Sequence, residues 1–92
     1  MNYRTIRDIK KANKNNGGHF FEKGALSFFQ SRVYDEVYQG KYFITSERFQ
    51  NEATKYTVRQ CDEEGDISTV GKFQAYQTLH EAVSAINLIA FR

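Results

Sequence analysis

Three side chains of the sequence, Cys61, His19 and His80, carry the chemistry of nucleophiles or zinc ligands. A zinc site usually shows paired Cys or His ligands at short spacing, whereas these three residues are widely separated along the chain. A metal site assembled in three dimensions from Cys61, a histidine and an acid such as Asp62 stays open as an alternative. Local packing is the simpler interpretation, so we expect no metal and no cofactor.

A thiolate–imidazole pair would make Cys61 a nucleophilic catalyst. Three acidic residues, Asp62, Glu63 and Glu64, follow it directly. Their negative charge would raise the pKa of the thiol and so lower its thiolate fraction. No strand-to-helix nucleophile motif surrounds the cysteine. We therefore expect no catalytic residue, and predict that the protein is not an enzyme.

Two further patterns resemble ion or nucleotide sites only in part. The acidic run at 62–66 lacks the alternating ligands and the closing Glu of an EF-hand calcium loop. The pair Gly17-Gly18 lacks the rest of a phosphate-binding loop and does not follow a predicted strand. We interpret the first as a solvated turn and the second as the end of a helix.

The size and composition of the chain indicate one small domain, which we expect to span residues 1–92. Its single cysteine allows no intrachain disulfide, which is typical of a reducing compartment. No segment approaches the roughly 20 apolar residues that span a bilayer, and no apolar stretch follows the charged N-terminus. We expect a cytoplasmic protein without membrane contact.

Charge is unevenly distributed, although the net charge is only +2. Five basic side chains lie in the first 14 residues and form the first candidate binding group: Arg4, Arg7, Lys10, Lys11 and Lys14. The acidic run at 62–66 is the opposite pole of charge. Two such poles can steer association with a charged partner. A basic stripe of this kind binds phosphates, binds an acidic protein groove, or is only a solvated face, and the sequence leaves these readings open.

Helical spacing of apolar residues predicts three helices. The first spans 3–14, with Asn2 as its N-cap and a stop at Gly17. The second, shorter helix spans about 22–32. The last begins at a capping box, in which Thr78 caps the amide of Glu81. Its apolar face comprises Leu79, Ala82, Val83, Ile86 and Ile89.

Between the second and third helices the apolar period changes to two, which predicts strands. Four segments fit this pattern: 33–39, 41–48, 55–62 and 66–76. Turns at 39–40 and 63–65 connect them as two hairpins, and Gly71 indicates a bulge or a close backbone approach. The predicted fold class is α+β, in the order ααββββα, with a four-stranded antiparallel sheet packed against helices.

Tyrosines on the strands form the second candidate binding group. We expect three short helices to leave part of the sheet open, and so expect some tyrosines to be exposed. The candidates are Tyr34, Tyr38 and Tyr42. Tyrosine beside arginine suits a protein interface, while stacking of nucleobases is an alternative. A half-buried structural role as strand formers is the simpler interpretation for most of them.

Several short motifs resemble a family of small proteins of unknown function found in phages and mobile elements. The motifs are GHFF at 18–21, FFQSR at 28–32, YFITSE at 42–47, YTVR at 56–59 and TVGKFQAY at 69–76. The resemblance covers about residues 15–85. It implies a genetic setting and carries over no catalytic residues.

Small phage proteins without enzymatic motifs often disable a host protein by binding it, as inhibitors of CRISPR effectors do. Our leading hypothesis is a non-enzymatic binding protein that inhibits a host factor sterically, with a nucleoprotein defence nuclease as the expected partner. The alternative is a nucleic-acid-binding accessory protein that uses the basic first helix. We expect a monomer or a weak dimer, because edge strands of a small sheet can pair.

Overall fold

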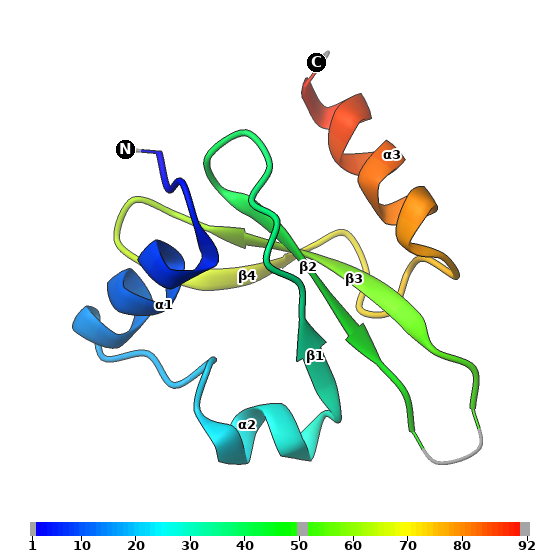
Figure 1. Cartoon of the computed structure of the whole chain (residues 1–92), viewed down its shortest axis with the longest axis horizontal. Helices are drawn as coiled ribbons and strands as arrows, with labels where there is room; N and C mark the ends of the chain where they lie inside the picture. Colours follow the sequence, from blue (N-terminus) through cyan, green and yellow to red (C-terminus); the bar gives the residue numbers. More distant parts are fainter. Residues whose placement is uncertain (1, 50–51, 91–92) are drawn as a thin grey trace.

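A computed structural model describes residues 2–49 and 52–90 of the chain (Figure 1). Its elements are α1 (Ile6–Asn15), α2 (Lys23–Phe28), β1 (Ser31–Val33), β2 (Tyr42–Glu47), β3 (Lys55–Cys61), β4 (Ile67–Val70) and α3 (Leu79–Ala90). The strands form one sheet in the order β1-β2-β3-β4, and all neighbours are antiparallel. The predicted α+β class and the element order are confirmed.

Both faces of the sheet are covered, because successive side chains of a strand point to opposite faces. On β2, Phe43 packs with Ile9 of α1, while Ile44 packs with Ile86 of α3. Figure 1 shows α1 and α3 far apart, with the sheet between them. Helix α1 with the loop that follows it packs on one face, and α3 packs on the other. The sheet is open at its edge, where Ser68 and Thr69 of β4 remain exposed.

Helix α1 begins later than its apolar spacing predicts. Thr5 is the N-cap, and its Oγ1 accepts a hydrogen bond from the amide of Asp8 at 3.2 Å. Tyr3 is buried in the same core but lies before the helix, where its amide donates to the carbonyl of Gly40 at 2.7 Å. The prediction of Asn2 as the N-cap is wrong, because Tyr3, the first residue of the apolar stripe, lies outside the helix.

The second helix is shorter than predicted, and the first strand lies earlier than predicted: β1 shares only Val33 with the predicted strand 33–39, and residues 31–32 were predicted as helix. Helix α2 ends at Phe28, and Gln30 adopts a φ of 50°, which ends any helical path. The pairing of β1 with β2 starts at Ser31 and ends at Val33. Residues 35–37 lie outside the ladder, and Tyr38 and Tyr42 then form an isolated bridge. The turn predicted at 39–40 is confirmed, since both central residues adopt positive φ as a type I′ turn requires.

The last strand is interrupted by a loop at residues 71–75, which the sequence pattern predicted as strand. Gly71 has a φ of 76° and Gln74 a φ of 56°, so the chain leaves the ladder after Val70 and returns where Tyr76 bridges Tyr56. The amide of Gln74 donates to Oγ1 of Thr57 at 2.8 Å. The loop thereby crosses to the face of the sheet that α1 covers.

Helix α3 starts as predicted. The amide of Glu81 donates to Oγ1 of Thr78 at 3.1 Å, and Oε2 of Glu81 accepts from the amide of Gln77 at 3.1 Å. Ala82 and Ile86 are buried against the sheet, whereas Leu88 on the outer side is exposed. No helix in the described part of the chain is long and apolar enough to cross a membrane.

Candidate functional site

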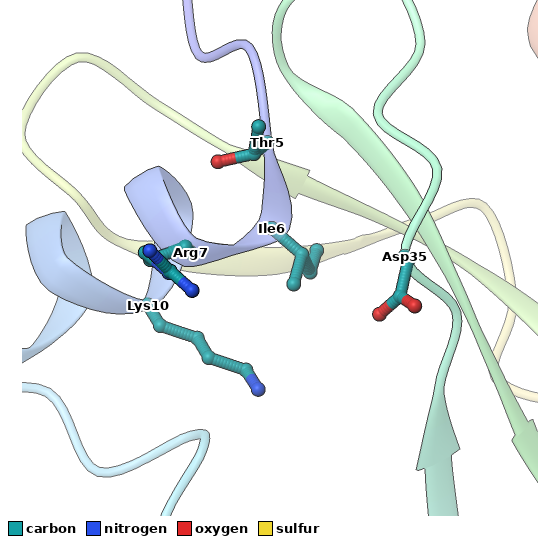
Figure 2. Close-up of a pocket in the computed structure, with 5 residues that line it drawn as sticks. All are labelled: Thr5, Ile6, Arg7, Lys10 and Asp35. Carbon is teal, nitrogen blue, oxygen red and sulfur yellow. The ribbon is translucent and has the colours of Figure 1, made fainter.

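The basic residues of the first candidate group lie on α1 and on the segment before it. All five side chains are exposed: Arg4, Arg7, Lys10, Lys11 and Lys14. Arg7 and Lys10 line a hollow of about 510 Å³ together with Thr5, Ile6 and Asp35 (Figure 2). The Asp35 carboxylate points into this hollow from the segment after β1, so its lining carries both signs of charge.

Lys10 also borders a second hollow, further toward the end of the helix. This one has a volume of about 280 Å³ and includes Lys14, Phe21 and Glu22 in its lining. The Nζ atom of Lys10 lies 5.8 Å from the centre of the Phe21 ring, within the range of a cation–π contact. Among residues 2–49 and 52–90, no carboxylate forms an ion pair with any of the five cations. Their charge therefore remains available to an anionic partner.

Asn13 of α1 points inward and holds three segments together. Its Nδ2 donates to the carbonyl of Gly65 at 2.9 Å, and its Oδ1 accepts from the amide of Phe20 at 3.3 Å. The side chain is buried. Asn13 therefore has a structural role, and only the outer face of α1 is free for binding.

The tyrosines of the second candidate group lie on the side of the sheet that α3 covers. Tyr42 is buried, and Tyr34 and Tyr38 are half-buried against the same core cluster. Burial, together with the charge of Glu36, raises the pKa of Tyr38. The structure therefore places the basic group and the tyrosine group on different sides of the molecule. None of the three tyrosines is fully exposed, which agrees with the simpler interpretation of a half-buried structural role.

The residues with nucleophilic or metal-ligating chemistry are not brought together. Cys61 is buried on the α1 side of the sheet, and burial raises the pKa of its thiol. His19 is exposed, with its Nδ1 atom 2.7 Å from Oε1 of Glu22, and His80 is exposed at the start of α3. Within the described ranges, no three His, Cys, Asp or Glu residues are placed to hold a metal ion.

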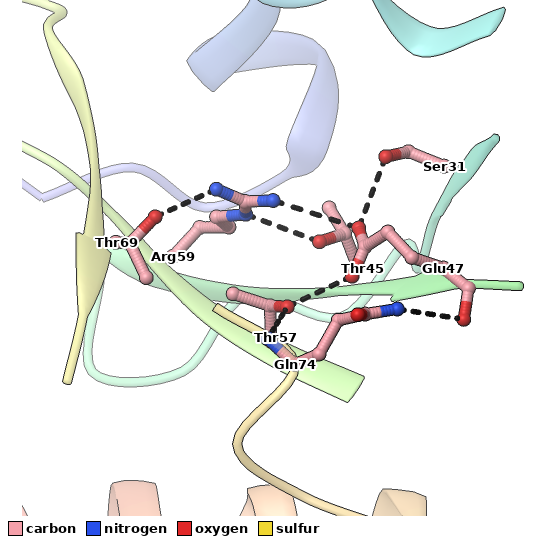
Figure 3. A network of polar contacts seen from close by, with 7 residues as sticks. All are labelled: Ser31, Thr45, Glu47, Thr57, Arg59, Thr69 and Gln74. Atoms are coloured by element: carbon pink, nitrogen blue, oxygen red, sulfur yellow. Dashed lines mark hydrogen bonds and ion pairs between the residues drawn. The ribbon is translucent and has the colours of Figure 1, made fainter. Parts of the chain in front are cut away.

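A buried polar network lies on the α1 side of the sheet (Figure 3). Its centre is the carboxylate of Glu47, which is 0% exposed. The Oε1 atom accepts from Thr57 Oγ1 at 2.8 Å, and the Oε2 atom accepts from Ser31 Oγ at 3.0 Å. Arg59 Nη2 lies 3.5 Å from the same Oε2 atom. The buried charge of Glu47 is therefore both paired and hydrogen-bonded, as a charge in a core must be.

The Arg59 guanidinium extends this network toward the edge of the sheet. Its Nε donates to Thr45 Oγ1 at 3.1 Å and its Nη1 to Thr69 Oγ1 at 2.7 Å. The guanidinium carbon lies 5.3 Å from the ring centre of Phe20 and 5.4 Å from that of Phe73. Burial lowers the pKa of Arg59, and the nearby Glu47 carboxylate opposes this shift.

Three exposed phenylalanines adjoin this network and form what we call the aromatic surface: Phe28, Phe29 and Phe73. Their exposed fractions are 77%, 46% and 41%, respectively. The ring centres of Phe28 and Phe29 are 4.9 Å apart, and the ring centres of Phe29 and Phe73 are 6.0 Å apart. The end of α2 and the loop at 71–75 thus contribute to one continuous surface.

A cavity of about 270 Å³ opens beside the aromatic surface, and we call it the Arg59 cavity. Its lining comprises Phe20, Ala25, Leu26, Phe29, Ser31, Arg59, Thr69 and Phe73. Most of this lining is apolar, while Arg59 and the two hydroxyl residues add hydrogen-bonding groups. An apolar wall with a few polar groups at one end is the arrangement typical of binding pockets.

Sequence reasoning missed the Glu47–Arg59 pair and the role of Phe73. A signal for the pair was present: Phe43 and Glu47 occupy alternate positions of one strand, and Arg59 pairs in register with Phe43. A period of two therefore places both charges on the buried face of Phe43. Phe73 gave no such signal, because its position depends on the positive φ angles of the loop at 71–75.

Comparison with known proteins yields a family but no activity. No curated protein matches the chain, and no solved structure matches it either. A family of unknown function, DUF7447, matches residues 5–87, which include every described strand and most of α3. The chain therefore belongs to DUF7447, a family of unknown function.

Proposed function

We propose that this chain is a non-enzymatic binding protein that attaches to another protein through its aromatic surface, Phe28, Phe29 and Phe73. The observation that carries the proposal is the contact of these three exposed rings. A contiguous exposed apolar patch is typical of interaction sites, whereas isolated exposed apolar residues are ordinary. Phenylalanine and arginine are also among the residue types enriched at the cores of protein interfaces.

The surroundings of the aromatic surface support this role. Phe73 lies against the guanidinium of Arg59, and Phe29 lies against Phe73, so two of the three rings are held by neighbours before any partner binds. Ordering a side chain in advance reduces the entropy lost on association. The cavity beside the rings gives a partner a depression into which a side chain can be inserted.

We further propose that binding inhibits a host factor sterically, by occupying a surface that the factor needs for nucleic acid or for a partner. A defence nuclease complex is the target we favour. This part of the proposal is supported only by the resemblance to small phage and mobile-element proteins, since the family itself has no assigned function.

Affinity purification from host lysate tests the proposal when it is paired with surface variants. We expect the wild-type chain to retain one protein in stoichiometric amount, and Phe28→Ser with Phe29→Ser to lose it. Leu88→Ser is the matched control, because Leu88 is a comparably exposed apolar residue (68%) on the outer side of α3. Equal retention by the aromatic variant, or recovery of nucleic acid alone, would contradict the proposal.

Nucleic-acid binding through α1 is the second candidate function. It is favoured by the five exposed cations and by the two hollows that flank Lys10. If all five cations contact phosphates, the logarithm of the binding constant should fall with the logarithm of salt concentration with a slope of roughly −4 to −5.

A gel-shift assay at low salt tests this second candidate. Arg7→Glu with Lys11→Glu should abolish retardation of DNA or RNA. Lys23→Glu with Lys72→Glu is the control, since it makes the same change in net charge at exposed positions outside α1. Equal loss in both double variants would indicate a general charge effect, and unchanged retardation would exclude α1 as the contact.

A further inference from the structure

We propose that the Arg59 cavity receives a single tyrosine side chain of the partner protein. This inference rests on the proposed function, because it names the chemistry by which the aromatic surface would recognise its target. It is supported by the size of the cavity, the nature of its walls, the hydrogen-bonding groups at its polar end and the net charge of that end.

The size of the cavity fits one side chain. Its volume is about 270 Å³, just below the range of roughly 300–1,000 Å³ that is typical of small-molecule sites. At protein interfaces, a buried pocket of this kind commonly receives one large anchor residue, and tyrosine is among the residue types enriched there.

The walls of the cavity favour an aromatic occupant. Rings of Phe20, Phe29 and Phe73 line it, and Ala25 and Leu26 complete its apolar part. The rings of Phe29 and Phe73 already meet at an interplanar angle of 65°. An inserted aromatic ring can therefore make the offset or edge-to-face contacts that such rings prefer.

The polar end of the cavity offers hydrogen-bond donors. A guanidinium has five N–H groups, and the Arg59 guanidinium uses three of them, toward Thr45, Thr69 and Glu47. One N–H on Nη1 and one on Nη2 remain. The Thr69 hydroxyl accepts from Arg59, so its own hydrogen is free to be donated. The occupant should therefore carry an acceptor oxygen.

The charge of the polar end restricts that oxygen to a neutral group. Glu47 lies 3.5 Å from Arg59 and is fully buried, so the two charges already compensate each other. A carboxylate or phosphate in the cavity would add a second negative charge that nothing balances, and a buried unbalanced charge is strongly unfavourable. A phenol meets both requirements, because it combines an aromatic ring with a neutral oxygen that accepts hydrogen bonds.

A nucleobase has similar chemistry, yet the surroundings favour a protein. None of the α1 cations lines the Arg59 cavity. The surface that continues outward from it is the apolar pair Phe28 and Phe29 rather than a basic groove that could follow a phosphate backbone. We therefore assign the cavity to a side chain and treat base binding as an outcome of the test.

Titration with small probes, followed in nitrogen–proton correlation NMR spectra, tests the assignment on the intact chain. N-acetyl-tyrosine amide should shift the signals of Phe20, Thr69, Phe73 and the Arg59 Nε–H. N-acetyl-phenylalanine amide, which lacks the hydroxyl, should bind about fivefold more weakly, as expected for the loss of one hydrogen bond. Uridine should bind more weakly than the tyrosine probe.

Two variants and one control complete the experiment. Thr69→Val keeps the shape of the exposed Thr69 side chain but removes its hydroxyl, which is a donor to the cavity and the acceptor that positions Arg59 Nη1, so it should reduce the preference for the tyrosine probe. Phe73→Leu should weaken binding of both amino-acid probes. Leu88→Ala on the outer side of α3 should change neither. Equal binding of the two amino-acid probes, stronger binding of uridine, or shifts confined to other surfaces would overturn the assignment.

Failure of this inference and failure of the proposed function give different results. In the first case, a partner protein is retained through Phe28 and Phe29, but Thr69→Val does not change the affinity for that partner and the tyrosine probe does not bind. The cavity assignment is then wrong and the proposed function stands. If the tyrosine probe binds as expected but no protein is lost on changing Phe28 and Phe29, the proposed function is wrong instead.

Discussion

The carboxylate of Glu47 and the guanidinium of Arg59 form an ion pair inside the fold, with 3.5 Å between Oε2 and Nη2. Glu47 is 0% exposed and Arg59 is 8% exposed. The pair belongs to adjacent strands of the sheet, and Arg59 also lines the cavity beside the aromatic surface. Stability and the proposed binding site therefore depend on the same two side chains.

Removal of one partner of this pair should be far more harmful than replacement of both. Glu47→Ala leaves the Arg59 charge buried without its counter-charge, and we expect a loss of about 3–5 kcal/mol in the free energy of unfolding. Glu47→Leu with Arg59→Met replaces both charges by apolar groups and should lose much less, because a buried pair contributes little net stability. Urea denaturation, read by circular dichroism, measures both.

A double variant as unstable as Glu47→Ala would show that the threonine hydrogen bonds, rather than the charges, carry the stability of the network. Thr57→Val separates the two effects, because it removes the 2.8 Å bond to Glu47 Oε1 and leaves the ion pair in place. It also removes the acceptor for the amide of Gln74. Its expected loss is about 1–3 kcal/mol.

Asn13 should contribute to the stability of the fold, because it lies on the inner face of α1, opposite the basic outer face. Asn13→Ala leaves the Gly65 carbonyl and the Phe20 amide without their partner, and we expect a loss of about 1–3 kcal/mol. Asn15→Ala, at an exposed position of the same helix, should stay within about 0.5 kcal/mol of the wild type. Thermal and urea unfolding provide the comparison, and equal stabilities would contradict the role given to Asn13.

Local patterns predicted the element order, because they depend on short-range chemistry. The period-two runs, the turn at 39–40 and the capping box at Thr78 all act within a few residues. The ends of the elements were predicted less well. Strand β1 stops at Val33 although strand-forming residues continue, because pairing with β2 is lost over 35–37. Such pairing is a tertiary effect that propensity does not contain.

The candidate site was predicted in part for a similar reason. Exposure of the four cations on α1 follows from helical geometry, whereas Arg4 is exposed on the segment before the helix. The sequence left open which tyrosines are buried, because their exposure depends on which faces α1 and α3 cover. A strand pattern does not say that the two helices lie on opposite faces. Phe73 was missed because the loop at 71–75 carries it across the edge of the sheet.

The turn after β3 should tolerate no side chain at Gly65. This residue has a φ of 93°, and a Cβ atom added there would overlap the carbonyl oxygen of Ala12 in α1. Gly65→Ala therefore combines backbone strain of about 1–3 kcal/mol with displacement of the helix. Gly71→Ala is the control, because its φ of 76° imposes similar strain but no atom lies within 4 Å. Denaturation midpoints should fall clearly further for Gly65→Ala.

The thiol of Cys61 should be almost unreactive in the folded protein. It is 1% exposed, and its pKa is raised by burial, so both access and thiolate fraction are low. At pH 8 we expect a thiol-reactive disulfide reagent to modify it on the order of a hundredfold more slowly than in urea. Cys61→Ala with Ser68→Cys moves the thiol to an exposed position of β4 and should react rapidly without urea. Fast modification of the wild type would contradict the buried position.

Tyr3 should make the protein less stable at alkaline pH. Burial, reinforced by its contact with Cys61, raises the pKa of Tyr3 to about 12 from an ordinary value of 10.0. Below pH 10 the phenol is protonated in both the folded and the unfolded chain, and its contribution is fully present. Between pH 10 and 12 the unfolded chain loses this proton first, so the free energy of unfolding falls. Tyr38 and Tyr56 also have raised pKa values and add to the fall.

Tyr3→Phe isolates the contribution of Tyr3 to this alkaline loss. The variant lacks the bond from the Tyr3 hydroxyl to the Asp62 carbonyl (2.7 Å), so it should be about 1 kcal/mol less stable at pH 7. Its decline between pH 10 and 12 should nevertheless be shallower than that of the wild type, by on the order of 1–2 kcal/mol. Urea unfolding across this range gives both slopes. Parallel slopes would mean that the folded and unfolded chains bind the Tyr3 proton equally well, which a buried, hydrogen-bonded phenol would not do.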